Sequence, residues 1–275
     1  MRLLIAAAGL PHSEAALRLG ACFLHTQQFE QVPTILTVIQ RAGERAATLE
    51  NLRRAHALLG AAPDAVQIKI RTGRVAEEIV NEIVEGAYNL VIVGKGSART
   101  LLARLLGTTT VQVAEHAPCS VAIAAGEISA LRHILVCDSG AHSPSLLNRF
   151  QSEVGALLPA VRTITVLHVM SQISAGPRVR GEQLRADAAQ LMRDHAHEGE
   201  LLTQDLQALQ TAHIQAIPKV RHGFVVDEIL AEARGGAYDL VVIGAHQQER
   251  WTGFLLDDLA EQIITGIDRP VLLMR

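Results

Sequence analysis

Aromatic residues, cysteines and excess basic charge are all scarce in this chain. Only 3% of its 275 residues are aromatic although 49% are hydrophobic, so the expected core is aliphatic. The 25 lysines and arginines against 28 aspartates and glutamates give a net charge of −3. This balance argues against a protein that binds nucleic acid through a basic surface. The three cysteines, Cys22, Cys119 and Cys137, are far apart and form no CxxC pair, which favours free thiols in a reducing compartment.

Long hydrophobic runs are absent too. No stretch approaches the ~18 to 20 apolar residues that a membrane-spanning helix needs. Residues 1–15 imitate a short signal peptide, with Arg2 ahead of an apolar stretch. Because a counterpart of this stretch lies deep inside the chain, we interpret it as a structural strand. The sequence therefore predicts a cytoplasmic protein without membrane contact.

The chain repeats itself, which is the main clue to its organisation. Residues 71–94 match residues 221–244 at an offset of 150, without a gap, and 12 of the 24 positions are identical. Upstream, residues 3–17 align with residues 134–147 at an offset of 130. The sequence thus predicts one duplicated domain, as residues 1–127 and 131–275. The difference between the two offsets places an insertion in the second copy, within residues 171–212.

Short β-branched runs alternate with helical periods in both halves. These runs are apolar throughout, as in parallel strands that are buried on both faces. The expected strands are Leu3–Ala7, Thr34–Ile39, Val66–Arg71, Leu90–Val93 and Val121–Ala124, then Ile134–Cys137, Thr163–Val169, Ala216–Val220, Leu240–Ile243 and Val271–Met274. A long helix is expected from Glu182 to Leu209, with Gly199 as a kink. The alternation predicts an α/β fold with two tandem, doubly wound, five-stranded parallel sheets of Rossmann-like type.

Ligands of such sheets bind beyond the carboxyl ends of the strands, so the loop after the fourth strand is the place to look. In the first half it begins at Gly94 and reaches Gly107-Thr108, and His116-Ala117-Pro118-Cys119 follows. This pattern resembles the universal stress protein family, whose signature is G-x2-G-x9-G-[ST] followed by a similar entry into the last strand. The second glycine position holds Ser97, with Gly96 one residue earlier. The resemblance covers essentially the whole chain, twice.

The resemblance implies an adenine nucleotide alpha hydrolase-like fold and a site for ATP or another adenine nucleotide. Glycines let the backbone approach an anion, and the free N–H groups at a helix N-terminus favour phosphate. Lys95, Arg99 and Arg104 would add positive charge. The candidate nucleotide-binding residues are Gly94, Lys95, Gly96, Ser97, Arg99, Gly107, Thr108 and Thr109. No metal is expected beyond a Mg²⁺ that accompanies the nucleotide.

Each half departs from the family pattern in its own way. The family's aspartate after the first strand, which helps to hold the nucleoside, falls on Ala8 in the first half. The second half keeps it as Asp138, but Asp257 and Asp258 stand at the third glycine and hydroxyl positions. Two carboxylates at a helix N-terminus repel phosphate. We therefore expect one nucleotide per chain, in the first half.

Catalytic patterns are missing from the sequence. It contains no Walker A, GxSxG or HExxH motif and no paired Cys/His spacing, so no catalytic or metal-ligating residues are expected. The leading interpretation is a non-enzymatic, tandem universal stress protein with a regulatory role in stress response. Two alternatives stay open: a nucleotide-free interaction scaffold with two vestigial sites, and an ATP-using enzyme of the same broad fold.

The expected assembly follows from the last strand of each half. In this family such edge strands pair two domains, so we expect the halves to form an intramolecular pseudo-dimer about a pseudo-two-fold axis. Left free, apolar edges of this kind would promote aggregation. Higher oligomers stay open, and the sequence names no protein partner.

Overall fold

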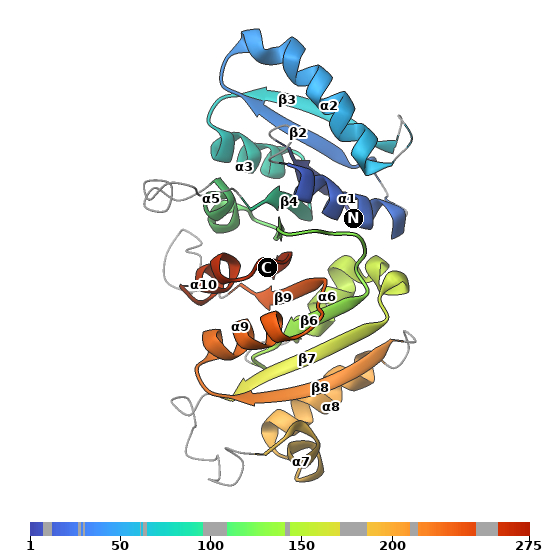
Figure 1. The fold of residues 1–275 in the computed structure, drawn as a ribbon, viewed down its shortest axis with the longest axis vertical. Coiled ribbons are helices and arrows are strands. Elements are labelled where there is room, and N and C mark those ends of the chain that lie inside the picture. The colour runs from blue at the N-terminus through green and yellow to red at the C-terminus, as the bar shows by residue number, and fades with distance from the viewer. Residues whose placement is uncertain are drawn as a thin grey trace.

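The structure is a computed structural model of the chain. It describes residues 1–7, 13–26, 29, 31–60, 62, 65–95, 109–140, 144–170, 186–209, 214–245 and 258–275. Figure 1 shows the two halves stacked along the long axis of the molecule, with both chain termini near its middle.

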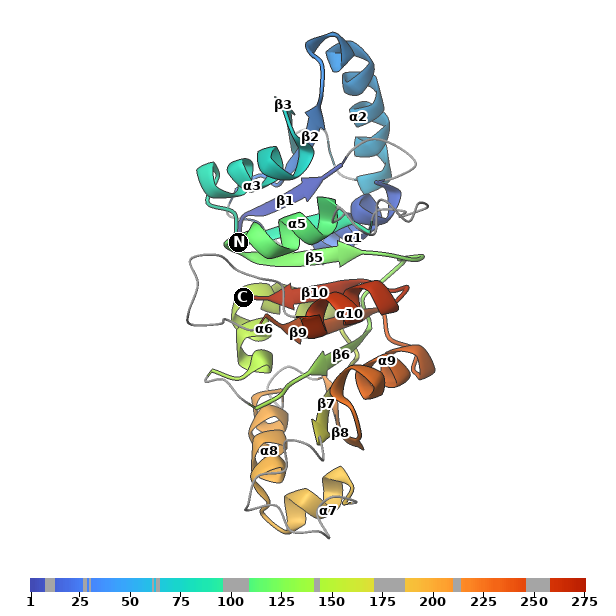
Figure 2. The same cartoon turned by 90° about the vertical axis from the view of Figure 1, so that its left-hand side faces the viewer.

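Ten strands join in one continuous sheet. Their order is β3-β2-β1-β4-β5-β10-β9-β6-β7-β8. The strands are β1 (Leu3–Ala6), β2 (Thr34–Ile39), β3 (Gln67–Thr72), β4 (Leu90–Gly94), β5 (Ser120–Ala124), β6 (His133–Cys137), β7 (Thr163–Met170), β8 (Gln215–His222), β9 (Leu240–Gly244) and β10 (Val271–Met274). Neighbours within each half are parallel, whereas β5 and β10 are antiparallel. Figure 2 shows this antiparallel pair at the centre of the molecule. The predicted fold and its pseudo-two-fold symmetry are confirmed.

Helices cover both faces of the sheet. The α-helices are α1 (Glu14–Thr26), α2 (Arg45–Leu59), α3 (Val75–Glu85), α5 (Thr109–His116), α6 (Leu146–Val154), α7 (Ala188–Arg193), α8 (His197–Leu209), α9 (Val225–Gly235) and α10 (Asp258–Gly266), with short 3₁₀ turns at Ala42–Glu44 and Gly155–Ala160. Apolar residues of α1, α2, α6 and α8 pack in one core cluster. Those of α3, α5, α9 and α10 pack in a second cluster. The strands therefore separate two aliphatic cores, as the uniformly apolar sequences of the inner strands predict.

The prediction of one long helix from Glu182 to Leu209 is wrong. Two helices, α7 and α8, stand in its place, and His195 between them has φ +50°, which ends helical geometry. Gly199 is not a kink but a point of close approach, since a Cβ there would lie 2.1 Å from the carbonyl oxygen of Leu191. Residues 171–185, the start of the expected insertion, lie outside the described part of the chain.

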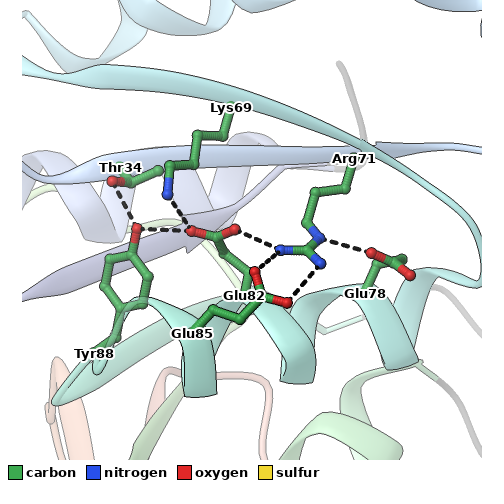
Figure 3. Close-up of polar contacts among 7 residues, drawn as sticks. All are labelled: Thr34, Lys69, Arg71, Glu78, Glu82, Glu85 and Tyr88. Carbon is green, nitrogen blue, oxygen red and sulfur yellow. Dashed lines mark hydrogen bonds and ion pairs between the residues drawn. The ribbon is translucent and has the colours of Figure 1, made fainter.

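A buried carboxylate fastens the edge strand of the first half to helix α3 (Figure 3). Glu82 of α3 accepts hydrogen bonds from Lys69 Nζ at 2.6 Å and Arg71 Nη1 at 2.9 Å, both on β3. The Tyr88 hydroxyl lies 3.1 Å from Glu82 Oε1 and 2.9 Å from Thr34 Oγ1. The Glu82 side chain is only 4% exposed. Desolvation raises the pKa of Glu82, but the bonds from Lys69 and Arg71 outweigh it, so this pKa lies below its usual value.

The second half repeats this network at an offset of 150 residues. Glu232 of α9 accepts hydrogen bonds from Lys219 at 2.8 Å, Arg221 at 3.0 Å and the Tyr238 hydroxyl at 2.6 Å. The pKa of Glu232 is likewise lowered, because its hydrogen bonds outweigh a desolvation that acts in the opposite direction. Four of the identical residues found in the sequence repeat, Arg71, Glu78, Glu82 and Tyr88 with their counterparts, thus belong to the network that attaches each edge strand.

Replacing the buried carboxylate should be costly. Glu82→Ala leaves Lys69 and Arg71 without their shared partner, and the loss of hydrogen bonds to a charged group costs about 1.5–3 kcal/mol. Glu85 also binds Arg71, at 2.8 Å and 3.1 Å, but its side chain is 64% exposed. Glu85→Ala should therefore cost much less stability than Glu82→Ala, because ion pairs of exposed side chains contribute little. Urea unfolding of both variants measures this, and equal losses would contradict a special role for Glu82.

Candidate functional site

The strand order of each half reverses at one point, between β1 and β4 and between β6 and β9. Open α/β sheets bind ligands at such switch points. Gly94 is the last residue of β4, and Thr109 is the first of α5. The candidate residues Gly96, Ser97, Arg99, Gly107 and Thr108 lie between them, outside the described residues. The structure therefore describes the two ends of the candidate site, at the end of β4 and at the start of α5.

A buried threonine joins these two ends. The hydroxyl of Thr110 donates to the carbonyl oxygen of Gly94 at 2.8 Å, and Thr110 is 5% exposed. This bond brings the first turn of α5 to the end of β4. The helix N-terminus, where backbone N–H groups lack helical partners, consequently lies at the switch point.

Thr110 was not among the predicted site residues. The family motif ends at Thr108, so motif matching does not reach it. One signal was available: Thr110 shares the buried face of α5 with Val113 and Ala114, and a buried hydroxyl requires a hydrogen-bond partner.

Lys95, expected to add charge at a phosphate site, is directed elsewhere. Its ammonium donates to the carbonyl oxygens of Ile267 at 2.7 Å and Thr265 at 3.1 Å, at the C-terminal end of α10. Asp268 Oδ1 lies 3.7 Å from it. Burial lowers the pKa of Lys95. Any contact of Lys95 with phosphate would require these bonds to α10 to break.

The position of the family's aspartate needs a correction of one residue. Ala7 N donates to Leu36 O at 2.8 Å, and Asp138 N donates to Leu167 O at 3.0 Å. Both bonds are related by an offset of 131, so Ala7 and not Ala8 is the counterpart of Asp138. The alignment offset of 130 is therefore wrong at this strand, and the equivalent bonds Leu17 N to Ser13 O and Arg149 N to Ser145 O give an offset of 132 at the helices that follow. Both candidates are alanine, so at this position the first half still carries no carboxylate.

The carboxylate of Asp138 accepts hydrogen bonds from backbone N–H groups of the same chain. Its Oδ1 accepts from Gly140 N at 2.8 Å and its Oδ2 from Leu146 N at 2.7 Å. His168 Nδ1 lies 3.1 Å from the Asp138 carbonyl oxygen and therefore donates to it. Burial lowers the pKa of His168, which favours the neutral ring. Both carboxylate oxygens thus order the entry to α6.

Side chains of α6 lie over the end of β9 in the second half. A Cβ built on Gly244 would be 3.3 Å from Arg149 Nη2 and 3.8 Å from Leu146 Cδ1. The counterpart of Thr110, at an offset of 150, is Ala260, which has no hydroxyl to bind the strand end. Asp257 lies outside the described residues, and α10 begins at Asp258. The two switch points therefore differ in their described residues, in addition to the predicted difference in their loops.

A second buried carboxyl group lies near this switch point. Asp205 of α8 is 4% exposed, and its Oδ1 accepts a hydrogen bond from Ser145 Oγ at 2.8 Å. Ser145 in turn caps α6, accepting from Asn148 N at 3.3 Å. Desolvation, aided by the charge of Asp138, raises the pKa of Asp205 to about 6, although the Ser145 bond opposes it.

Metal-ligand clusters and membrane-spanning helices were searched only where the chain is described. No group of three or more His, Cys, Asp or Glu side chains in that part could hold a metal ion. None of the helices assigned there has the length and hydrophobicity to cross a membrane.

The fold and the switch points define a tandem α/β protein with two doubly wound halves. The profile of the universal stress protein family matches residues 1–125 and again residues 131–275. The chain belongs to the universal stress protein family. A search of curated protein sequences finds no significant match.

Solved structures agree in fold. A universal stress protein from Archaeoglobus fulgidus DSM 4304 superposes with a TM-score of 0.69 at 14% identity, covering 100% of this chain and 96% of that one. A functionally unknown protein from Pseudomonas aeruginosa PAO1 gives a TM-score of 0.66 at 14% identity, covering 99% and 92%. A universal stress protein crystallised in complex with cAMP covers 45% of this chain and 95% of its own, with 22% identity and a TM-score of 0.38. The full-length likenesses show the fold alone.

Asp205 makes stability depend on pH. Its folded pKa of about 6 lies above the ordinary value of 3.8, so protonation favours the folded state. The stabilisation is complete below about pH 4 and is lost as the pH rises through 6, a difference of about 3 kcal/mol. Asp205→Asn keeps an acceptor for Ser145 without the charge, so it should be more stable than the parent at pH 7.5 and lose this advantage toward pH 4.

Thermal unfolding from pH 4 to 7.5 measures the difference between Asp205→Asn and the parent. Asp194→Asn, at an exposed position outside α7 and α8, is the matched control and should show no such trend. A constant difference for Asp205→Asn across this range would contradict the assignment.

Proposed function

We propose that the protein is a regulatory, non-enzymatic stress-response protein that binds one adenine nucleotide, ATP in the first instance, in its first half. The nucleotide would lie at the carboxyl ends of β1 and β4, with its phosphates at the N-terminus of α5. Membership of the family supports the class of protein. The nucleotide itself is inferred from the residues.

The observation that carries the proposal is the bond between Thr110 and Gly94, 2.8 Å long. It holds a helix N-terminus at the switch point of the sheet, where free N–H groups and the helix dipole favour an anion. The loop that joins the two ends contains Gly107 and Thr108, which match the family motif. Arg99 and Arg104 are the cations expected there, because Lys95 is engaged by α10.

The second half is proposed to hold no nucleotide. Arg149 and Leu146 lie against Gly244. Both carboxylate oxygens of Asp138 already accept hydrogen bonds from backbone N–H groups. The sequence adds Asp257 and Asp258 where phosphate would approach. A nucleotide-free scaffold is favoured by one further observation, since Ala7 replaces the nucleoside-holding aspartate in the first half. We therefore expect weak binding even there.

Catalysis is not part of the proposal, because the sequence offers no nucleophile and base in a recognisable pattern. We also propose a cytoplasmic location. Cys22, Cys119 and Cys137 are free thiols in the structure, and free thiols are typical of reducing compartments.

Calorimetric titration with Mg-ATP tests the proposal, and we expect a stoichiometry of one per chain. Gly107→Asp puts a carboxylate and a side chain where phosphate approaches, at a cost of several kcal/mol near a protein surface. Binding should therefore fall by at least about 100-fold. Asp257→Asn is the matched control in the second half and should leave the stoichiometry at one.

Three outcomes would overturn parts of the proposal. Two sites per chain would contradict the assigned asymmetry, and unchanged binding in Gly107→Asp would contradict the location. Absence of binding, together with absence of nucleotide in denatured, freshly purified protein by mass spectrometry, would favour the scaffold. Turnover of ATP that disappears in Gly107→Asp would favour an enzyme.

A further inference from the structure

The antiparallel pair of β5 and β10 forms the seam between the two halves, and its register is symmetric about one residue pair. In the antiparallel pair of β5 and β10, Ala122 faces Leu272, while Val121 faces Leu273 and Ile123 faces Val271. Equivalent positions of the two halves differ by 150 residues. Ala122 and Leu272 are therefore the one equivalent pair in which each residue faces its own counterpart. The pseudo-two-fold axis passes between them.

A small residue meets a large one on this axis. Ala122 and Leu272 are both 0% exposed and belong to the same core cluster. Side chains opposed across an antiparallel pair have Cβ atoms ~5 Å apart. A first half paired with a copy of itself would oppose two alanines and leave a void. A second half paired with itself would oppose two leucines and overfill the same space.

At one end of the seam a cation of the first half lies near a carboxylate that only the second half has. Lys95 caps the C-terminal end of α10, and Asp268 Oδ1 lies 3.7 Å from its ammonium. The counterpart of Asp268 in the first half is Pro118, and the counterpart of Lys95 in the second half is Ala245. Lys95 facing a second copy of the first half would meet no carboxylate at this position.

The other end depends on a residue that only the first half has. Ser120 Oγ accepts from Arg275 N at 3.2 Å and donates to Glu153 Oε2 at 2.7 Å. The Arg275 guanidinium also donates to the carbonyl oxygens of Ala114 and Glu115, at the C-terminal end of α5. The counterpart of Ser120 in the second half is Pro270, which has no hydroxyl. Two second halves could not form the two bonds of the Ser120 hydroxyl.

We propose that this seam is selective: the first half recognises the second half in preference to a copy of itself, through Ala122 and Leu272 on the axis and through the polar contacts at the two ends. The partner that fits each edge strand is the other half of the same chain. A seam of this kind disfavours the pairing of two first halves or of two second halves and keeps each first half beside one second half. The inference stands whether or not the first half binds nucleotide.

Four versions of the intact chain test the axis. Leu272→Ala reproduces the axis of two first halves, and Ala122→Leu reproduces that of two second halves. The double variant Ala122→Leu/Leu272→Ala restores one small and one large residue in the opposite order. We expect each single variant to unfold at least about 5 °C below the parent. The double variant should return to within about 2 °C of the parent.

The control separates complementarity across the seam from simple burial. Leu240 of β9 is 0% exposed and belongs to the same cluster as Leu272 but does not pair with β5. In Ala122→Leu/Leu240→Ala the two losses should add. A single variant as stable as the parent would overturn the proposal, because two alanines or two leucines on the axis would then cost no stability. A double variant Ala122→Leu/Leu272→Ala as unstable as the sum of its singles would overturn it as well.

Discussion

The antiparallel pairing of β5 with β10 is the constraint on which the rest of the molecule depends. It turns two five-stranded sheets into one sheet of ten strands and buries two apolar strands that would otherwise be open edges. It also brings each half's last helix to a cation of the other half, Lys95 at α10 and Arg275 at α5. The halves are therefore parts of one core and not independent bodies on a linker.

The outermost strands of the sheet are held to the helices by polar contacts and not by apolar packing alone. Strands β3 and β8 are the outermost strands, and the side chains they turn toward α3 and α9 are charged. Glu82 and Glu232 are buried but satisfied by hydrogen bonds from their own edge strand and tyrosine. Removing one partner of such a network costs more than the net contribution of the intact network. This physical demand accounts for the identity of these residues in both halves.

The two halves share a backbone but differ in side-chain chemistry at the switch point. In the first half Thr110 binds the end of β4, whereas the second half has Ala260 there and Arg149 over Gly244. Both halves thus keep the strands and the ion-pair networks, while their switch points differ. Asp138 illustrates the difference, because both of its carboxylate oxygens accept backbone hydrogen bonds at the entry to α6.

Much of this protein could be predicted from local sequence. Short β-branched runs located all ten strands to within two residues. The ungapped repeat at an offset of 150 indicated a duplicated fold, because both signals are carried by consecutive residues. The destination of Lys95 could not be read in this way, since it binds carbonyl groups about 170 residues further along the chain. Nor could the break between α7 and α8, where the close approach of Gly199 to Leu191 overrides a continuous helical period. The sequence by itself determined the strands, the duplication and the family. Only the tertiary structure decided which charged and polar side chains lie at the switch points and which lie at the seam, because those contacts join residues that are distant in the chain.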